Sequence, residues 1–332
     1  MHGGGLQKGR RGLVSAAWRD KRCCQRDKRC LTRGAGGVSL QAIVRRLYRD
    51  RWGYAFIIPS FVLFAFFFLV PVIWGGYLSL LDYKVFDKQW IGIRNYVELF
   101  QNHLFWVALR NTALYTLAVV PLWLGKALII SALIFPFSKP IQTFFKAAFY
   151  LPHVTSAVII SMVWLWIFNP PFGLLNYLMD LVGLGPHAWL GDVRTALLSI
   201  VFMQVVMGGG SSIVLITAAM GSIPYHLYEA AYLDGATKAQ AFFRVTVPLL
   251  RPTLLYLMVM GTISSFQVFT NIYLMTQGGP QFATTTLVYL IYDTAFKQFN
   301  FGLASAQAVV LFAIVFVLAV AQFKWLGQEV EY

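Results

Sequence analysis

Residues 223–252 read IPYHLYEAAYLDGATKAQAFFRVTVPLLRP, a polar stretch between two long apolar ones. Pro224 suits a helix start, because its missing N–H falls where no intrahelical partner exists. The pattern predicts a short helix over Tyr225 to Asp234, which Gly235 ends because glycine adopts the left-handed conformation at little cost. A second short helix is expected over Ala236 to Val245 before the chain returns to apolar sequence.

Apolar sequence on both sides of this stretch defines the class of protein. Of 332 residues, 58% are hydrophobic and 12% are charged, whereas soluble domains carry about 25% charged residues. A helix needs about 20 apolar residues to cross a bilayer core of about 30 Å. Six stretches are long enough, and Lys126 interrupts one of them: residues 52–81, 109–135, 147–179, 195–228, 252–292 and 298–323. The longest is broken by Gln277-Gly278-Gly279-Pro280 and counts as one span. The sequence predicts an all-α, polytopic membrane protein with six transmembrane helices.

The distribution of Lys and Arg predicts the orientation. The formal net charge is +14, but residues 1–52 hold 14 Lys or Arg against 3 Asp or Glu. With the N-terminus in the cytoplasm, 20 Lys or Arg lie on the cytoplasmic side and 6 on the other, as the positive-inside rule favours. We therefore expect both termini in the cytoplasm. Because the excess charge is confined to the N-terminal segment, a nucleic-acid-binding surface is not expected.

The composition divides the chain into two parts. Residues 1–50 are basic and glycine-rich, which predicts a disordered cytoplasmic leader, and they lack the apolar stretch of a signal peptide. Residues 51–328 are expected to form the transmembrane domain, with residues 223–252 as its largest cytoplasmic loop. Metal binding is not expected, because Cys23, Cys24 and Cys30 lack the spacing of a zinc site.

The loop at residues 223–252 allows two interpretations. Small side chains at Ala230 and Ala231 permit close approach, and the carboxylates of Glu229 and Asp234 can meet basic groups on a partner. The loop is then a knob that docks on another subunit. Alternatively, it is a solvated loop that lies on the lipid headgroups.

The motifs of this loop resemble a known family. Glu229-Ala230-Ala231, Asp234-Gly235-Ala236 and Val247-Pro248 match the EAA loop of ABC importer permeases, the membrane subunits of binding-protein-dependent transport systems. Further segments resemble the carbohydrate-uptake branch of that family, including Tyr150-Leu151-Pro152 at the start of a third span. The others are Pro59 to Tyr83, Trp90-Ile91-Gly92 with Asn95-Tyr96, Asn111-Thr112, Phe168-Asn169-Pro170, and Thr276 to Pro280 with Thr284 to Thr286 and Tyr292 to Phe296.

The resemblance implies a type I permease fold and a mechanism. Glu229, Ala230, Ala231 and Asp234 would belong to a coupling helix that docks on an ATPase subunit, and Gly235 would permit the bend beneath it. The implied partners are a second homologous permease subunit, two ATP-binding subunits and an extracytoplasmic solute-binding protein. The implied location is the cytoplasmic membrane of a prokaryote.

Catalysis is not expected in this chain. It contains no G-x-x-x-x-G-K-[ST] phosphate loop, which an ATPase of this type needs to bind its nucleotide. No catalytic residue and no cofactor of its own are therefore predicted, and ATP and Mg²⁺ would be used by the partner ATPase subunits.

Polar residues within the fourth and fifth spans are candidates for a solute path. Three consecutive glycines at 208–210 are expected to loosen the fourth span and expose backbone groups. The resemblance implies solute contacts in the same two spans. Alternatively, Ser and Gly merely permit tight helix packing. The candidates are Gln204, Gly208, Ser211, Ser264, Ser265 and Gln267.

The sequence allows two alternatives each for the solute and for the role of Lys126. A sugar or related polyol is expected from the resemblance, with glycerol phosphate or another non-sugar solute as the alternative. An ion-coupled carrier is disfavoured, because the predicted spans contain no Asp or Glu to hold an ion. Lys126 either extends its side chain toward the cytoplasm or pairs with another group along the path.

Overall fold

The computed structural model describes residues 51–84 and 87–326, so the leader expected over residues 1–50 lies outside the described part. The chain divides into two compact units at Val70 and Pro71. The first contains α2 (Arg51–Phe64) and η1 (Ala65–Leu69), and α3 (Val70–Leu78) continues the helix into the second unit. The apolar part, Phe56–Leu78, has 23 residues and is about 34 Å long at about 1.5 Å per residue.

A hairpin and a short helix follow the first span. β1 (Leu81–Lys84) pairs antiparallel with β2 (Asp87–Trp90), and α4 spans Arg94–Gln101. The buried Asn95 donates from Nδ2 to the carbonyls of Ser79 and Leu81, each at 2.8 Å. This side chain therefore joins α4 to the end of the first span.

The second and third spans differ in regularity. α5 (His103–Ile134) is continuous over 32 residues, whereas α6 (Lys139–Val154) and α7 (Ala157–Ile167) meet at an angle of 92°. Tyr150 lies inside α6, so the expectation that Tyr150 begins the third span was wrong. The bend comes later, at extended residues 155–156, where Ser156 accepts the N–H of Val158 at 3.3 Å and starts α7.

The fourth span is interrupted at the glycines. α8 (Leu174–Leu181) precedes it, and α9 (Ala196–Met207) and α10 (Gly210–Gly221) then form the span with a bend of 45°. Gly209 has φ of +98°, which a side chain would make strained. The predicted loosening of this helix is confirmed.

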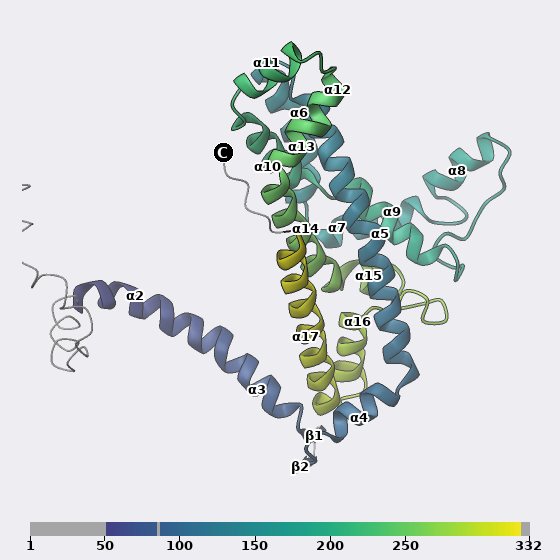
Figure 1. Ribbon diagram of the computed structural model, residues 1–332. Coiled ribbons are helices and arrows are strands. Elements are labelled where there is room, and N and C mark those ends of the chain that lie inside the picture. Colours follow the sequence, from purple (N-terminus) through teal and green to yellow (C-terminus); the bar gives the residue numbers. More distant parts are fainter. Residues whose placement is uncertain (1–50, 85–86, 327–332) are drawn as a thin grey trace, which may run out of the picture. The chain divides into compact units, whose positions relative to one another are not determined.

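The cytoplasmic loop and the last two spans complete the chain (Figure 1). The loop contains α11 (His226–Leu233), α12 (Lys238–Ala241), η2 (Phe242–Thr246) and α13 (Val247–Leu249). The last spans and their connection are α14 (Arg251–Phe266), α15 (Thr270–Met275), α16 (Leu287–Tyr292), η3 (Asp293–Lys297) and α17 (Phe301–Leu326). The break expected at residues 277–280 falls between α15 and α16.

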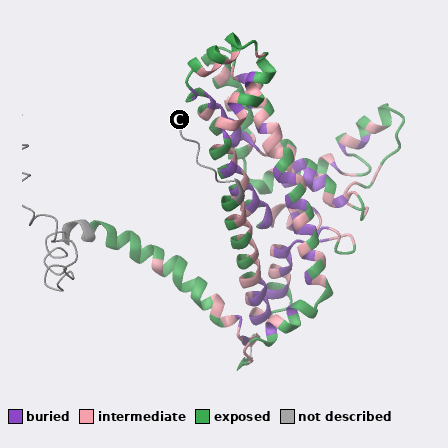
Figure 2. Ribbon diagram, in the orientation of Figure 1, coloured by how far each residue is buried: buried purple, intermediate pink, exposed green. Residues whose placement is uncertain are grey.

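Buried residues gather where α5 packs against α9, α10 and α14 (Figure 2). Four helices of the described residues are long and apolar enough to cross a membrane, and the two bent pairs bring the number to six if each pair is one span. The fold is therefore mostly helical, as expected. In the second unit, α11 and α12 lie at one end and the β1–β2 hairpin at the other (Figure 1).

Candidate functional site

The first part of the site is the loop that contains Glu229. α11 ends in a Schellman motif: Gly235 has φ of +80°, its N–H donates to Tyr232 O at 3.0 Å, and the N–H of Ala236 donates to Ala231 O at 2.9 Å. This pattern satisfies the last carbonyls of a helix. Gly235 therefore terminates α11 as the sequence predicted.

The second short helix begins later than expected. Thr237 accepts the N–H of Gln240 at 3.3 Å, and Gln240 accepts the N–H of Thr237 at 2.8 Å, so α12 starts at Lys238 and not at Ala236. This reciprocal pair is a capping box. The Thr-x-x-Gln pattern in the sequence was the signal for it.

Contacts inside the loop attach it to the membrane helices. The hydroxyl groups of Tyr228 and Thr246 share a hydrogen bond of 2.9 Å, which joins α11 to η2. Leu227, Tyr228 and Phe242 pack against a buried cluster from α5, α10 and α14 that includes Ile216 and Leu257. α11 and η2 are therefore in contact with the buried cluster that these three helices form.

The outer surface of α11 is free for contact. Glu229, Ala230 and Asp234 are exposed, and Ala231 is half-buried. Leu233, at the end of α11, is 89% exposed. Within the described residues, Glu229 forms no ion pair. α11 thus presents carboxylates beside an exposed apolar side chain.

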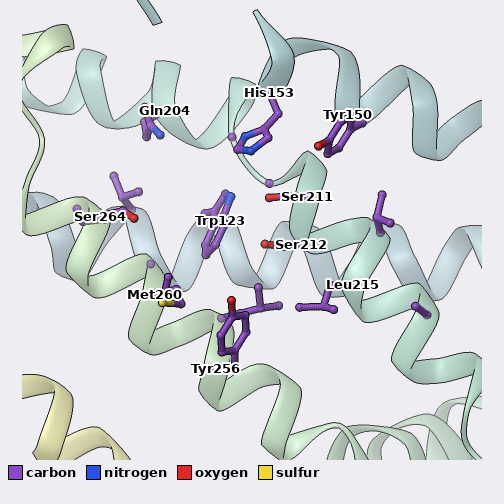
Figure 3. Close-up of a pocket in the computed structure, with 18 residues that line it drawn as sticks. Trp123, Tyr150, His153, Gln204, Ser211, Ser212, Leu215, Tyr256, Met260 and Ser264 are labelled. Carbon is purple, nitrogen blue, oxygen red and sulfur yellow. The ribbon is translucent and has the colours of Figure 1, made fainter. Parts of the chain in front are cut away.

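The second part of the site is a cavity of about 640 Å³ between α5, α6, α9, α10 and α14 (Figure 3). Five of the six residues predicted for the solute path line it: Gln204, Gly208, Ser211, Ser264 and Ser265. Gln267 is exposed at the C-terminal cap of α14 and is not among the lining residues. Ser264 and Ser265 lie on α14 beside the cavity, whereas Gln267 follows the last residue of α14 and lies outside the cavity lining.

A chain of hydrogen bonds fixes Gln204 at the wall of this cavity. Asn271 donates from Nδ2 to Oε1 of Gln204 at 2.9 Å, and Ser161 donates to Oδ1 of Asn271 at 3.1 Å. The three residues come from α9, α15 and α7. Because Oε1 already accepts a bond, the amide Nε2 of Gln204 is the group left to donate to a ligand.

Lys126 pairs with the backbone at the broken fourth span. Its ammonium group donates to the carbonyls of Val205 at 2.5 Å, Val206 at 3.0 Å and Gly208 at 2.6 Å. The last carbonyls of a helix have no intrahelical donor, and a cation there is favourable. Of the two expectations for Lys126, pairing is the one that the structure shows, with carbonyl groups as its partners.

Several lining residues were missed from the sequence. Trp123 occupies the space beside the broken span: a Cβ at Gly208 or Gly209 would lie 3.0 Å from its ring, and one at Gly261 would lie 2.9 Å from it. Glycines on two other helices leave room for the indole, a relation between separate segments that spacing along the chain does not show. The other missed residues include Tyr150, His153, Tyr256 and Met260 (Figure 3).

A multi-pass helical protein with a cavity of polar and apolar groups between broken spans, and an exposed loop attached to the same helices, is organised as a membrane transport protein. Residues 127–332 match the family described as the inner membrane component of binding-protein-dependent transport systems. The chain belongs to this family, the permease subunits of ABC importers. It is therefore a multi-pass protein of the cytoplasmic membrane.

Curated relatives and solved structures agree with this assignment. The chain is 37% identical to the probable ABC transporter permease YurN of Bacillus subtilis, over 82% of this chain and 94% of YurN. It is 30% identical to the multiple sugar-binding transport system permease MsmF of Streptococcus mutans, over 85% and 97%. A bacterial alginate ABC transporter, solved in complex with an alginate pentasaccharide-bound periplasmic protein, has the same fold: the TM-score is 0.76 at 24% identity, over 84% of this chain and 95% of that one.

Proposed function

We propose that this chain is one of two related membrane subunits of an importer for a sugar or related polyol. Membership of the permease family, and the named function of the relative MsmF, support a carbohydrate as the solute. ATP and Mg²⁺ are bound by two separate ATP-binding subunits, and an extracytoplasmic protein delivers the solute. This chain forms part of the solute path, and conformational changes of the ATP-binding subunits act on it.

One observation supports the coupling role above all others. Leu227 and Tyr228 of the exposed helix α11 pack against a buried cluster to which α5, α10 and α14 contribute residues, and the same three helices line the cavity. Because packed interiors transmit displacement with little compression, a push on α11 moves the cavity walls. Glu229 is the principal polar contact to the ATPase subunit, with Ala230, Ala231 and Asp234 beside it and Gly235 at the turn.

The cavity suits a carbohydrate. Hydroxyl and amide groups of Gln204, Ser211, Ser264 and Ser265 stand beside aromatic side chains such as Trp123. Polar groups for hydroxyl recognition next to apolar surface are the usual composition of a small-molecule site. Gly208 adds backbone groups at the broken helix.

The coupling role is tested by substitution at the exposed tip of α11. Leu233→Asp places a charge where the proposal buries an apolar side chain against the ATPase subunit, and loss of that burial is worth about 1.5–3 kcal/mol. We expect at least about tenfold weaker co-purification of the ATPase subunits with the full-length chain.

The matched control is Phe172→Asp, because Phe172 is 79% exposed in the connection between α7 and α8, remote from the loop in sequence. This variant should retain the ATPase subunits. Equal recovery of those subunits with both variants would show that α11 is not the docking element.

A further inference from the structure

The break between α9 and α10 brings two helix ends of opposite polarity to the cavity. The last carbonyls of α9 form a negative end, and the first N–H groups of α10 form a positive end. α10 has 12 residues, and the N–H groups of Gly210, Ser211 and Ser212 precede the backbone bond from Ile213 to Gly209 O at 3.0 Å. Gly209, Ser211 and Ser212 line the cavity, so the positive end faces it.

Lys126 neutralises the negative end of α9. Its ammonium group occupies the carbonyls of Val205, Val206 and Gly208. In the described part of the chain, no carboxylate pairs with Lys126. A helix end carries about half an elementary charge, so the full charge of the lysine exceeds that of the end it caps. The break therefore has net positive charge.

Ser212 gives a second and independent indication of a ligand. Its side chain is fully buried and lines the cavity, yet its hydroxyl group has no hydrogen-bond partner. An unpaired buried hydroxyl is costly. Figure 3 shows the hydroxyl groups of Ser211 and Ser212 on one turn of α10, on the side toward Trp123. The unpaired hydroxyl thus lies at the positive helix end, where an oxygen of a ligand would satisfy it.

The rest of the cavity does not repel a negative charge. None of the described residues that line it is Asp or Glu. Its remaining polar side chains include Tyr150, His153, Gln204 and Ser264, which can serve the neutral hydroxyl groups of a sugar. No described carboxylate of the cavity lining therefore opposes an anionic group at the start of α10.

We infer that the N-terminus of α10, together with the hydroxyl groups of Ser211 and Ser212, binds an oxyanion group on the transported carbohydrate. The group is the carboxylate of a uronic acid or a phosphate ester, since both match a helix N-terminus. Lys126 is a positioning residue that caps α9 and keeps the potential at the break positive. The inference rests on the proposed function for the carbohydrate and for transport, whereas the electropositive site stands on the geometry of the break.

The potential at the break is measured with charged thiol reagents on the full transporter complex. Ala218→Cys lines the cavity, and Phe172→Cys is the exposed reference. The rates of modification by anionic sulfonatoethyl methanethiosulfonate and cationic trimethylammonioethyl methanethiosulfonate are followed by mass spectrometry of the labelled peptide. A unit charge at about 10 Å and an effective dielectric constant of about 20 raises the local concentration of an anion about tenfold and lowers that of a cation about tenfold. We therefore expect the anionic-to-cationic rate ratio to be about a hundredfold higher at residue 218 than at residue 172.

Variants of the lysine complete this measurement. Lys126→Met should lower the ratio at residue 218 by about a hundredfold, Lys126→Arg should retain it, and Lys324→Met should leave it unchanged as the matched loss of one cation. Equal ratios at the two cysteines, or a ratio unaffected by Lys126→Met, would overturn the inference. If Lys126→Met does not assemble, the comparison of residues 218 and 172 in the chain with Lys126 still decides it.

Protection from modification identifies the ligand group. Glucuronate, glucose-6-phosphate and glucose are compared at equal concentration on the Ala218→Cys complex. Protection by glucuronate alone indicates a carboxylate, and protection by glucose-6-phosphate alone indicates a phosphate ester; Ser212→Ala should weaken either. Protection by glucose equal to that by the anions, or by none of the three, would contradict the inference. Because ATPase recruitment by α11 is scored separately with Leu233→Asp, failure here is distinguishable from failure of the proposed function.

Discussion

Gly209, at the break in the fourth span, shapes the cavity at the scale of a single residue. Gly209 adopts φ of +98°, and a Cβ there would also lie 3.0 Å from the indole nitrogen of Trp123. Glycine is required at this position for two separate reasons, backbone conformation and space. The break leaves carbonyl groups at the end of α9, which accept hydrogen bonds from Lys126. It also leaves N–H groups at the start of α10, which lie beside the cavity.

Gly209→Ala should reduce transport by at least about tenfold, because a left-handed residue with a side chain costs about 1–2 kcal/mol and the new methyl group displaces Trp123. Uptake is measured at matched levels of protein in the membrane. Gly221→Ala is the control, since Gly221 lies in the same helix with open space around its Cβ position. Equal loss in both variants would mean that helix α10 tolerates no side chain in general.

The Ser161–Asn271–Gln204 chain gives a second prediction at this scale. Asn271→Ala removes the donor to Oε1 of Gln204, whereas Ser161 keeps its bond to Ala157 O at 2.8 Å. The loss should cost about 1–3 kcal/mol and lower the thermal stability of the purified subunit. Gln204→Ala should have a similar effect, and the double variant should be less destabilised than the sum by about 0.5–3 kcal/mol. Strictly additive losses would show that these residues act independently.

At the scale of the element, the loop at residues 223–252 was largely predictable, and five polar or glycine residues of the cavity were predicted, but its aromatic lining was not. Proline, the Glu-Ala-Ala triplet and Gly235 are local signals, so α11 and its end follow from neighbouring residues. Trp123, Tyr150, His153 and Tyr256 reach the cavity from other helices, and their positions depend on packing between distant segments. The helix start expected at Tyr150 was also misplaced, because α6 continues through Pro152 and the bend of 92° comes only at residues 155–156.

Thr237→Ala should loosen α12 without changing the spans. Loss of a threonine N-cap costs about 0.5–2 kcal/mol, so amide hydrogen exchange of residues 237–241 should accelerate by about fivefold or more. The control is Thr143→Ala, whose hydroxyl donates to Lys139 O within α6 and starts no helix. Unchanged exchange in α12 would contradict the role assigned to the capping box.

At the scale of the whole molecule, side chains of the exposed helix α11 pack against residues of α5, α10 and α14, the helices that also line the cavity. Its six apolar segments were evident from the absence of charge, because a membrane core tolerates few charged groups. The bends of the third and fourth spans, which open the cavity between α6, α9 and α10, depend on how these segments pack. The proposed mechanism therefore depends on coupling between α11 and the cavity.

Uptake by the reconstituted transporter tests that coupling most directly. The complex of both membrane subunits, the ATPase subunits and the binding protein is placed in proteoliposomes, and ATP-driven accumulation is measured for a radiolabelled carbohydrate that the binding protein retains. Glu229→Lys reverses the charge at the docking surface, and Asp180→Lys makes the same change on α8, at the exposed residue Asp180. We predict that Glu229→Lys lowers accumulation at least about tenfold while the chain stays in the membrane, and that Asp180→Lys retains it. Full accumulation with Glu229→Lys would contradict the account.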